Sequence, residues 1–217
     1  GEDAGLHAAL EAAGDGGPKN WRRQLEAVLG VGARGTVEGF HEFLLDLVRD
    51  GQPEPRFLAL CAAMLSAQTR DGATLAAVRQ LAATFGLGGR APRLQPAAVA
   101  LAPLEALEES LRGVNFHKTK AKSLRALAAA LLRDHEGLVP RGFGDLVALP
   151  GVGPKVANLV RSVAFGEVED CGMVVDTHVH RLARRLGWTD EADTDPEHTR
   201  RKLEAFVPPA VRELVTR

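Results

Sequence analysis

A short turn of glycines and prolines between two apolar segments constrains the fold of this chain more than any other feature. Leu146–Val160 reads LVALPGVGPKVANLV, so an apolar segment meets Pro150, a Gly-Val-Gly turn over residues 151–153, and Pro154. Proline is tolerated in the first turn of a helix, because its missing N–H would have no helical partner there. The stretch therefore predicts two helices joined as a hairpin over about residues 144–165.

Most of the remaining sequence shows helical periodicity. Only residues 173–175 resemble a short β-branched run with a period of two. Turn signals separate the periodic segments at residues 86–92, 112–116 and 136–142. We therefore expect an all-α protein of about ten short helices. The expected segments are residues 57–68, 73–85, 96–111 with an interruption at Pro103, 120–133 and the runs after Gly144.

Composition excludes several classes of protein. Two cysteines in 217 residues cannot form a disulfide framework, which indicates a reducing, intracellular compartment. No apolar run approaches the roughly 18 residues that span a bilayer, so we expect no membrane partner. The net charge of −1 argues against a histone-like nucleic-acid binder.

The charge is unevenly distributed along the chain. Residues 1–60 carry a balance of −4, whereas residues 111–166 carry +6. Residues 112–133 contain six bases and no acid. Such a run is usually a solvated helix face, but bases along one side of a helix also suit a phosphate-facing surface. The run by itself leaves both interpretations open.

The hairpin turn is also a candidate binding site. The amides of Gly151, Val152 and Gly153 can point outward, and the positive end of the next helix adds to them. Together they suit one phosphate group. The alternative is a tight connector between packed helices, but the full LPGVG sequence between apolar segments favours phosphate binding.

Three ordered motifs resemble a known family. They are MLSAQTRD (residues 64–71), LPGVGPK (residues 149–155) and VDTHVHRLARRLGW (residues 175–188). They look like the helix-hairpin-helix, Gly-Pro-Asp superfamily of DNA base-excision glycosylases, and within it endonuclease III. The spelling of the last two motifs resembles the eukaryotic-type thymine glycol glycosylase branch.

The resemblance implies the catalytic residues. It assigns Lys155 as the nucleophile at C1′ of the damaged nucleotide, which leads to a Schiff base and strand cleavage by β-elimination. A lysine in the first turn faces the positive end of the helix, which favours the neutral amine that attacks. Asp176, 21 residues later, is expected both to cap a helix and to stabilise positive charge on the sugar. The ten residues 166–175 are long enough to return it to the Lys155 end of the hairpin helix.

Extruding a damaged nucleotide leaves a gap in the duplex that the protein must fill. By resemblance, Gln68 and the loop over residues 114–120 do this, with Phe116 as the wedge. Asn115 stands where the family commonly has glycine, so the shape of that loop is expected to differ. The expected DNA contacts are Gly151, Val152, Gly153, Gln68, Phe116, His117 and Lys120, and the expected pocket residues are Asp71 and His178.

No metal or cofactor is expected in this chain. His178 and His180 have no third ligand at suitable spacing. The resembled family usually carries a [4Fe-4S] cluster on four cysteines beyond residue 208, but Cys61 and Cys171 lack the required spacing.

The expected organisation is two helical lobes with a cleft between them. Residues 1–20 are a flexible arm and residues 57–166 form the domain that carries the hairpin. Residues 21–56 join 167–217 in a second lobe that stops before the iron–sulfur loop.

The resulting functional hypothesis is a bifunctional glycosylase with abasic-site lyase activity. It acts as a monomer on oxidised or ring-saturated pyrimidines in damaged double-stranded DNA. A monofunctional glycosylase and a non-catalytic DNA-binding module are the alternatives. The compartment is left open among nucleus, mitochondrion, plastid and bacterial cytoplasm.

Overall fold

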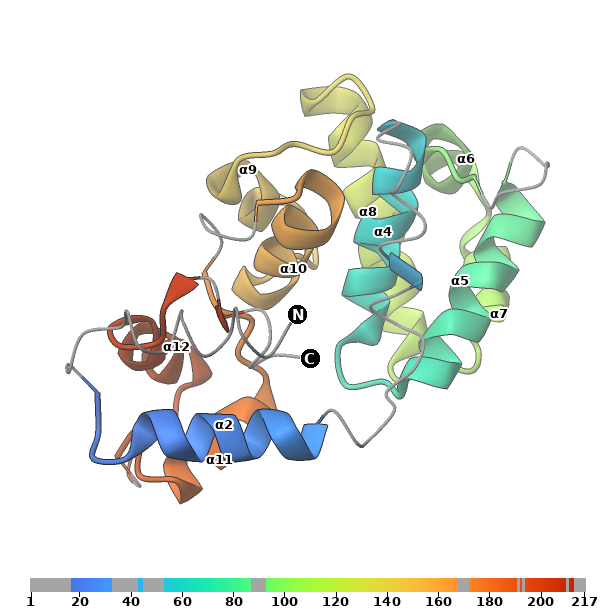
Figure 1. The fold of residues 1–217 in the computed structure, drawn as a ribbon. Helices are drawn as coiled ribbons and strands as arrows, with labels where there is room; N and C mark the ends of the chain where they lie inside the picture. The colour runs from blue at the N-terminus through green and yellow to red at the C-terminus, as the bar shows by residue number, and fades with distance from the viewer. Residues whose placement is uncertain are drawn as a thin grey trace. The chain divides into compact units, whose positions relative to one another are not determined.

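The structure is a computed structural model that describes residues 17–32, 43–44, 53–86, 93–167, 172–190, 192, 194–209 and 211–212. Every regular element in these ranges is a helix, and the order is shown in Figure 1. The expectation of an all-α protein is therefore confirmed. The stretch at residues 173–175 is extended but forms no strand.

The chain divides into two compact units. Unit 1 combines Gly1–Val37 with Glu167–Arg217, and unit 2 is the continuous segment Glu38–Gly166. By this division the described residues 43–44 and 53–56, which the sequence placed with the second lobe, fall within unit 2, and Leu44 is buried in the same apolar cluster as Phe57. Of the expected flexible arm, residues 1–16 lie outside the described residues, and the predicted cleft between the lobes stays a prediction.

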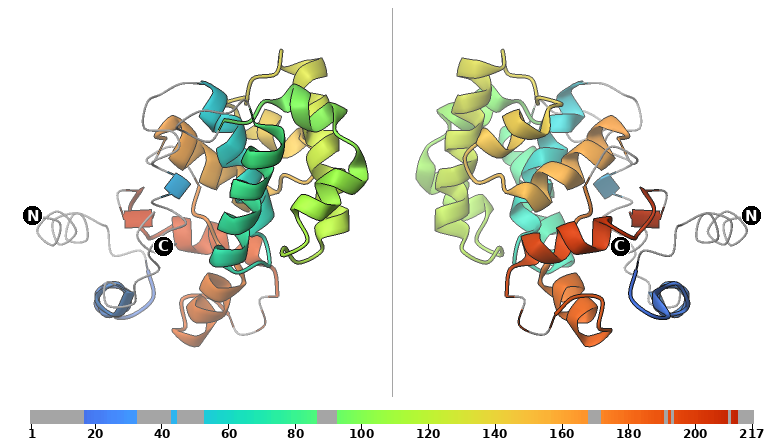
Figure 2. Two further views of the ribbon diagram at one scale, coloured as in Figure 1. Left: turned by 90° about the vertical axis from the view of Figure 1, so that its right-hand side faces the viewer. Right: turned by 90° about the vertical axis from the view of Figure 1, so that its left-hand side faces the viewer.

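Unit 2 is built around a helix with a continuous buried apolar segment. In α4 (Pro53–Ser66) every residue from Phe57 to Leu65 is buried. The other helices of unit 2 are α5 (Asp71–Phe85), α6 (Pro96–Leu101), α7 (Leu104–Ser110), α8 (His117–Asp134), α9 (Phe143–Ala148) and α10 (Pro154–Phe165). A segment that is apolar on all sides must be surrounded, and α4 packs against both α5 and α10. Further contacts join α6 and α7 to α8, α5 to α7, and α9 to α10, and the helices can be followed by their colours in Figure 2.

Unit 1 has a separate core of aromatic rings. It contains α2 (Trp21–Gly32), α11 (Thr177–Arg185) and α12 (Pro196–Glu204). The rings of Trp21 and Trp188 both meet Phe206 edge-on, with centroids 5.0 and 6.2 Å away. The indole N–H of Trp188 donates to Gln24 Oε1 at 2.7 Å. The contacts join α2 to a segment near the other end of the chain.

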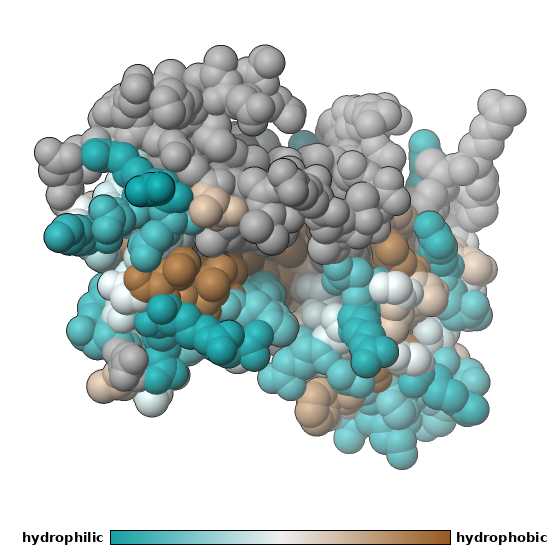
Figure 3. Space-filling model, turned by 60° about the horizontal axis from the view of Figure 1, so that its bottom comes forward, coloured by the Kyte–Doolittle hydropathy of each residue, from teal (hydrophilic) through white to brown (hydrophobic). Residues whose placement is uncertain are grey.

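Polar residues cover most of the described surface in Figure 3, and apolar residues are exposed there in small groups. No helix among the described residues has the length and apolar character that crossing a membrane requires.

Candidate functional site

The hairpin turn forms as the sequence predicts, between α9 and α10. Gly151 has φ +79°, a conformation that favours glycine, and Val152 N donates to Leu149 O at 3.1 Å. Gly153 is the N-cap of α10 and Pro154 its first residue. Val152 is buried, so its side chain anchors the turn while both glycines remain accessible.

The two glycines have different surroundings. A Cβ atom on Gly151 would lie 3.0 Å from Ser123 Cβ and 3.2 Å from Met64 Sδ, so the turn sits closely on α8 and α4. A Cβ on Gly153 would meet nothing within 4 Å among the described residues. Gly153 makes no side-chain cap, since it has no side chain, and the first amides of α10 point out at the positive end of the helix. This geometry suits an anion, and phosphate binding at residues 151–153 stays a prediction.

Lys155 is the second residue of α10 and is half-buried. Its neighbours Val156 and Ala157 are buried, and α10 packs against both α9 and α4. The start of the helix is therefore fixed by packing on two sides. The catalytic role of Lys155 stays a prediction.

Two predicted wedge residues, 48 positions apart in the sequence, are brought together in unit 2. The side chain of Asn115 donates from Nδ2 to the carbonyl oxygen of Gln68 at 2.5 Å, and Phe116 is the next residue in the chain. Gln68 has φ 53° and Phe116 has φ 58°, both in the left-handed region. Both side chains are exposed, Phe116 by 66%. A large, exposed aromatic residue rarely adopts the left-handed conformation, and residues that do so cluster at functional sites.

Lys120 lies one turn further along α8 and has an internal role. Its ammonium group donates to Leu65 O at 2.8 Å, to Ala67 O at 2.6 Å and to Thr69 Oγ1 at 2.9 Å. A cation is favourable at the negative C-terminal end of a helix, here α4. Burial lowers the pKa of Lys120 to about 8. The sequence predicted a DNA contact for this lysine; in the structure its protons are directed at acceptors within unit 2.

The other predicted residues of unit 2 lie at helix starts. His117 is the first residue of α8 and is half-buried. Asp71 is the first residue of α5, where a carboxylate suits the helix dipole, but the N-cap position itself belongs to Arg70. In the basic run over residues 112–133, the bases at both ends form exposed ion pairs, Arg112 with Glu109 and Arg133 with Asp134.

Asp176 is the N-cap of α11 in unit 1. Its Oδ1 accepts hydrogen bonds from the backbone N–H groups of His178 at 2.8 Å and Val179 at 2.9 Å. The capping role predicted from the sequence is confirmed, and its catalytic role stays a prediction. The side chain of His178 is exposed, and its place in a pocket also stays a prediction.

His180 occupies a buried, structural position in unit 1. Its ring is buried and its Nδ1 lies 2.7 Å from the hydroxyl of the fully buried Thr199 on α12. The bond joins α11 to α12. Thr199 was not among the residues predicted from the sequence, because no motif around it distinguishes it from other threonines.

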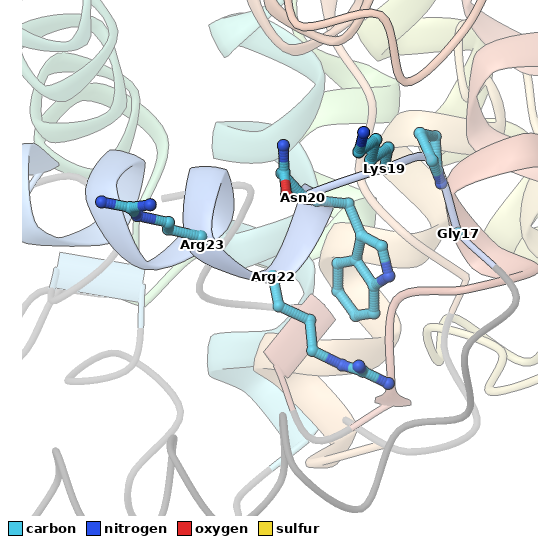
Figure 4. A pocket seen from close by; sticks show the side chains of 7 residues that line it. Gly17, Lys19, Asn20, Arg22 and Arg23 are labelled. Atoms are coloured by element: carbon cyan, nitrogen blue, oxygen red, sulfur yellow. The ribbon is translucent and has the colours of Figure 1, made fainter.

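A pocket at the start of α2 contains none of the predicted site residues. Seven consecutive residues, 17–23, line it at the start of α2 (Figure 4). Arg22 and Arg23 point in different directions there, and the guanidinium of Arg22 lies over the Trp21 ring, 5.3 Å from its centroid. This stacking is a contact within α2 itself.

The iron–sulfur cluster that the resemblance implies does not fit the residues present. A [4Fe-4S] cluster takes four thiolates, and the chain has two cysteines. Cys61 is fully buried inside α4, and burial raises the pKa of its thiol well above the usual range. Among the described residues, no three His, Cys, Asp or Glu side chains group to hold a metal ion. Cys171 lies outside the described residues.

Known proteins share both the sequence and the fold. Residues 61–209 match the family model described as HhH-GPD superfamily base excision DNA repair protein. Endonuclease III-like protein 1 of Bos taurus is 36% identical over 194 residues, which are 88% of this chain and 60% of that protein. Endonuclease III of Bacillus subtilis is 34% identical over 160 residues, 69% of this chain and 68% of that protein.

A solved structure of a trapped endonuclease III–DNA covalent intermediate is also similar. It has a TM-score of 0.65 at 30% identity, covering 81% of this chain and 79% of the solved one. The chain spans about 60% of the length of the bovine relative. By the matched family model and these identities, this chain belongs to the HhH-GPD superfamily of base excision DNA repair proteins and, within it, to the endonuclease III family.

Proposed function

We propose that this protein is a bifunctional DNA glycosylase with abasic-site lyase activity, which removes oxidised or ring-saturated pyrimidines from duplex DNA. The observation that carries the proposal is Lys155, held in the first turn of α10 directly after the hairpin turn. Family membership supports it, as does the solved endonuclease III that was trapped covalently on DNA.

The hairpin would bind the DNA backbone. The turn at Gly151–Gly153 and the start of α10 offer amides at the positive end of a helix dipole, where a phosphate oxygen is favourable. Because the buried Val152 anchors the turn, these amides are fixed before DNA arrives. The contact is independent of base sequence, as phosphate contacts are in general.

Lys155 would carry the covalent chemistry. Its neutral amine attacks C1′ of the damaged nucleotide, a new N–C bond forms, and the C1′–N bond to the base breaks as the base leaves with a proton. Opening of the sugar gives a Schiff base between Lys155 and C1′. Loss of a C2′ proton then expels the 3′ phosphate by β-elimination, and hydrolysis of the imine releases the enzyme.

Asp176 would support these steps as a carboxylate. Positive charge develops on the sugar as the base leaves, and a nearby carboxylate lowers the energy of that state. The carboxylate is held in place because one of its oxygens caps α11 through two backbone amides. Gln68 and Phe116 would occupy the space left by the extruded nucleotide, since both are exposed and lie on adjoining loops.

Borohydride trapping tests the proposal. Reduction of the Schiff base by sodium borohydride should join wild type covalently to a duplex with an abasic site, and Lys155→Gln should give no adduct while still binding a tetrahydrofuran-site duplex. Lys202→Gln, with the same charge change on α12, should give the wild-type yield. Binding without adduct or base release by wild type would instead support a non-catalytic module, and base release without adduct a monofunctional glycosylase.

The substrate class is tested separately. Duplexes carrying thymine glycol, 8-oxoguanine or uracil should be compared under single-turnover conditions. The proposal expects the thymine glycol duplex to be processed fastest, and preference for either other duplex would refute that part of it.

A further inference from the structure

Three side-chain hydrogen-bonding links fix the loop that follows α4. Asn115 donates to Gln68 O, and Lys120 donates to Ala67 O and Thr69 Oγ1, so the three consecutive residues 67–69 are all held. Asn115 lies two residues before α8, Phe116 is the N-cap of α8, and Lys120 lies in its first turn. The loop after α4 and the loop before α8 are therefore one connected structure.

This connected structure holds two non-glycine residues in a conformation that side chains disfavour. A left-handed residue costs about 1 kcal/mol or more and persists only where its surroundings impose it. Here both such residues, Gln68 and Phe116, are solvent-exposed, so burial of their side chains does not explain the conformation. The hydrogen bonds from Asn115 and Lys120 hold residues 67–69 directly. Phe116 lies between these two donors in the chain, and its carbonyl oxygen accepts from the backbone N–H of Lys120 at 2.9 Å.

We propose that Asn115 is a positioning residue. Together with Lys120 it holds Gln68 and Phe116 as a preformed insert, that is, two side chains arranged in advance to fill the gap left by the extruded nucleotide. The inference rests on the proposed function and adds the residues that shape the insert. Asn115 acts through the backbone of Gln68 and needs no contact with the DNA. Its carboxamide supplies a link that a glycine at position 115 cannot make.

Preforming the insert moves the ordering cost from DNA binding to folding. A loop that is already in its bound conformation loses little entropy when it enters the duplex. Extrusion of a paired, stacked nucleotide should therefore depend on Asn115. Cleavage at an abasic site, where no base needs to be unpaired, should depend on it much less.

The test is a double-mutant cycle with two substrates. Asn115→Ala should lower the single-turnover rate of base release from a thymine glycol duplex about fivefold, the equivalent of one hydrogen bond of about 1 kcal/mol. In a Gln68→Ala background the same substitution should cost less than about a further threefold, because one of the two side chains being positioned has gone. Borohydride trapping on an abasic-site duplex should change less than twofold.

The control is Gln80→Ala, which removes another exposed carboxamide, on α5, and should leave every rate unchanged. Thermal unfolding of Asn115→Ala within about 2 °C of wild type would show that the loss of rate is not a loss of fold. An unchanged rate for Asn115→Ala beside an active wild type, or losses that simply add in the double variant, would overturn the inference alone. A wild type that neither releases base nor forms an adduct would overturn the proposed function and this inference with it.

Discussion

Replacing each hairpin glycine with alanine should separate the turn's role in the fold from its role in binding. Gly151→Ala places a Cβ at φ +79°, 3.0 Å from Ser123 Cβ. The left-handed conformation costs about 1 kcal/mol for alanine, and the close contact is with an atom next to the backbone of α8, which moves little. Together we expect a loss of about 2–3 kcal/mol in the free energy of unfolding, or roughly 5–10 °C in melting temperature.

Gly153→Ala should leave stability nearly unchanged and weaken DNA binding. A Cβ there meets nothing within 4 Å in the described part of the chain, and φ is −96°, which any residue adopts. Alanine is a poorer N-cap than glycine but orders the unfolded chain, so stability should stay within about 0.5 kcal/mol of wild type. The added methyl lies where the proposed phosphate approaches, so affinity for a tetrahydrofuran-site duplex should fall by about tenfold.

Both variants are measured by calorimetric unfolding and by fluorescence anisotropy at one fixed salt concentration. Gly144→Ala, in α9, is the control, because no described residue lies within 4 Å of its Cβ position. Its DNA affinity should match wild type, and its stability should be equal or higher by up to about 1 kcal/mol, because alanine is the better helix former. Wild-type melting of Gly151→Ala would refute the steric argument. Wild-type affinity of Gly153→Ala would refute phosphate binding at the turn.

Three further predictions concern caps and buried polar groups. Asp176→Ala should lower the free energy of unfolding by about 1 kcal/mol in urea titrations, whereas Asp176→Asn keeps the capping oxygen and should lose base release without losing stability. Lys120 has a pKa of about 8 in the fold against an ordinary 10.5, so the unfolded chain binds more protons between these values. Wild-type stability should therefore rise, relative to Lys120→Met, by up to about 1 kcal/mol between pH 8 and pH 10.5, and a fall would contradict the assigned burial. Thr199→Val leaves the His180 ring nitrogen without its partner and should cost about 1–3 kcal/mol in calorimetry, with no change in DNA affinity.

The sequence was most informative where the determinants are local. The Pro-Gly-Val-Gly-Pro turn of the hairpin and the Asp176 cap each depend on residues within a few positions of one another, and both were predicted with the right geometry. The interruption at Pro103 likewise separates α6 from α7 as expected, because proline is disfavoured inside a helix.

Long-range polar contacts could not be predicted in the same way. The bond from Asn115 to Gln68 spans 47 positions, and the cap that Lys120 places on α4 spans about the same distance. Asn115 was predicted only to alter the shape of its loop, because the family commonly has glycine there, and Lys120 was predicted to contact DNA. Neither residue type specifies a partner, so only the packing of α8 beside α4 reveals what each does. The roles assigned to Lys155, Asp176 and the DNA-contact residues remain predictions from sequence.

The two units can form their cores at different times while the chain is being synthesised. Unit 2 is one continuous segment, so all of its helices are available once residue 166 has been made. Unit 1 must wait, because the hydrogen bond between Gln24 and Trp188 joins residues 164 positions apart. At about 5–20 residues per second, α2 leaves the ribosome roughly 8–30 s before its partner helices do. During that interval Trp21 and Leu25 have no core to enter, so unit 1 can complete its core only after all the helices of unit 2 have been made.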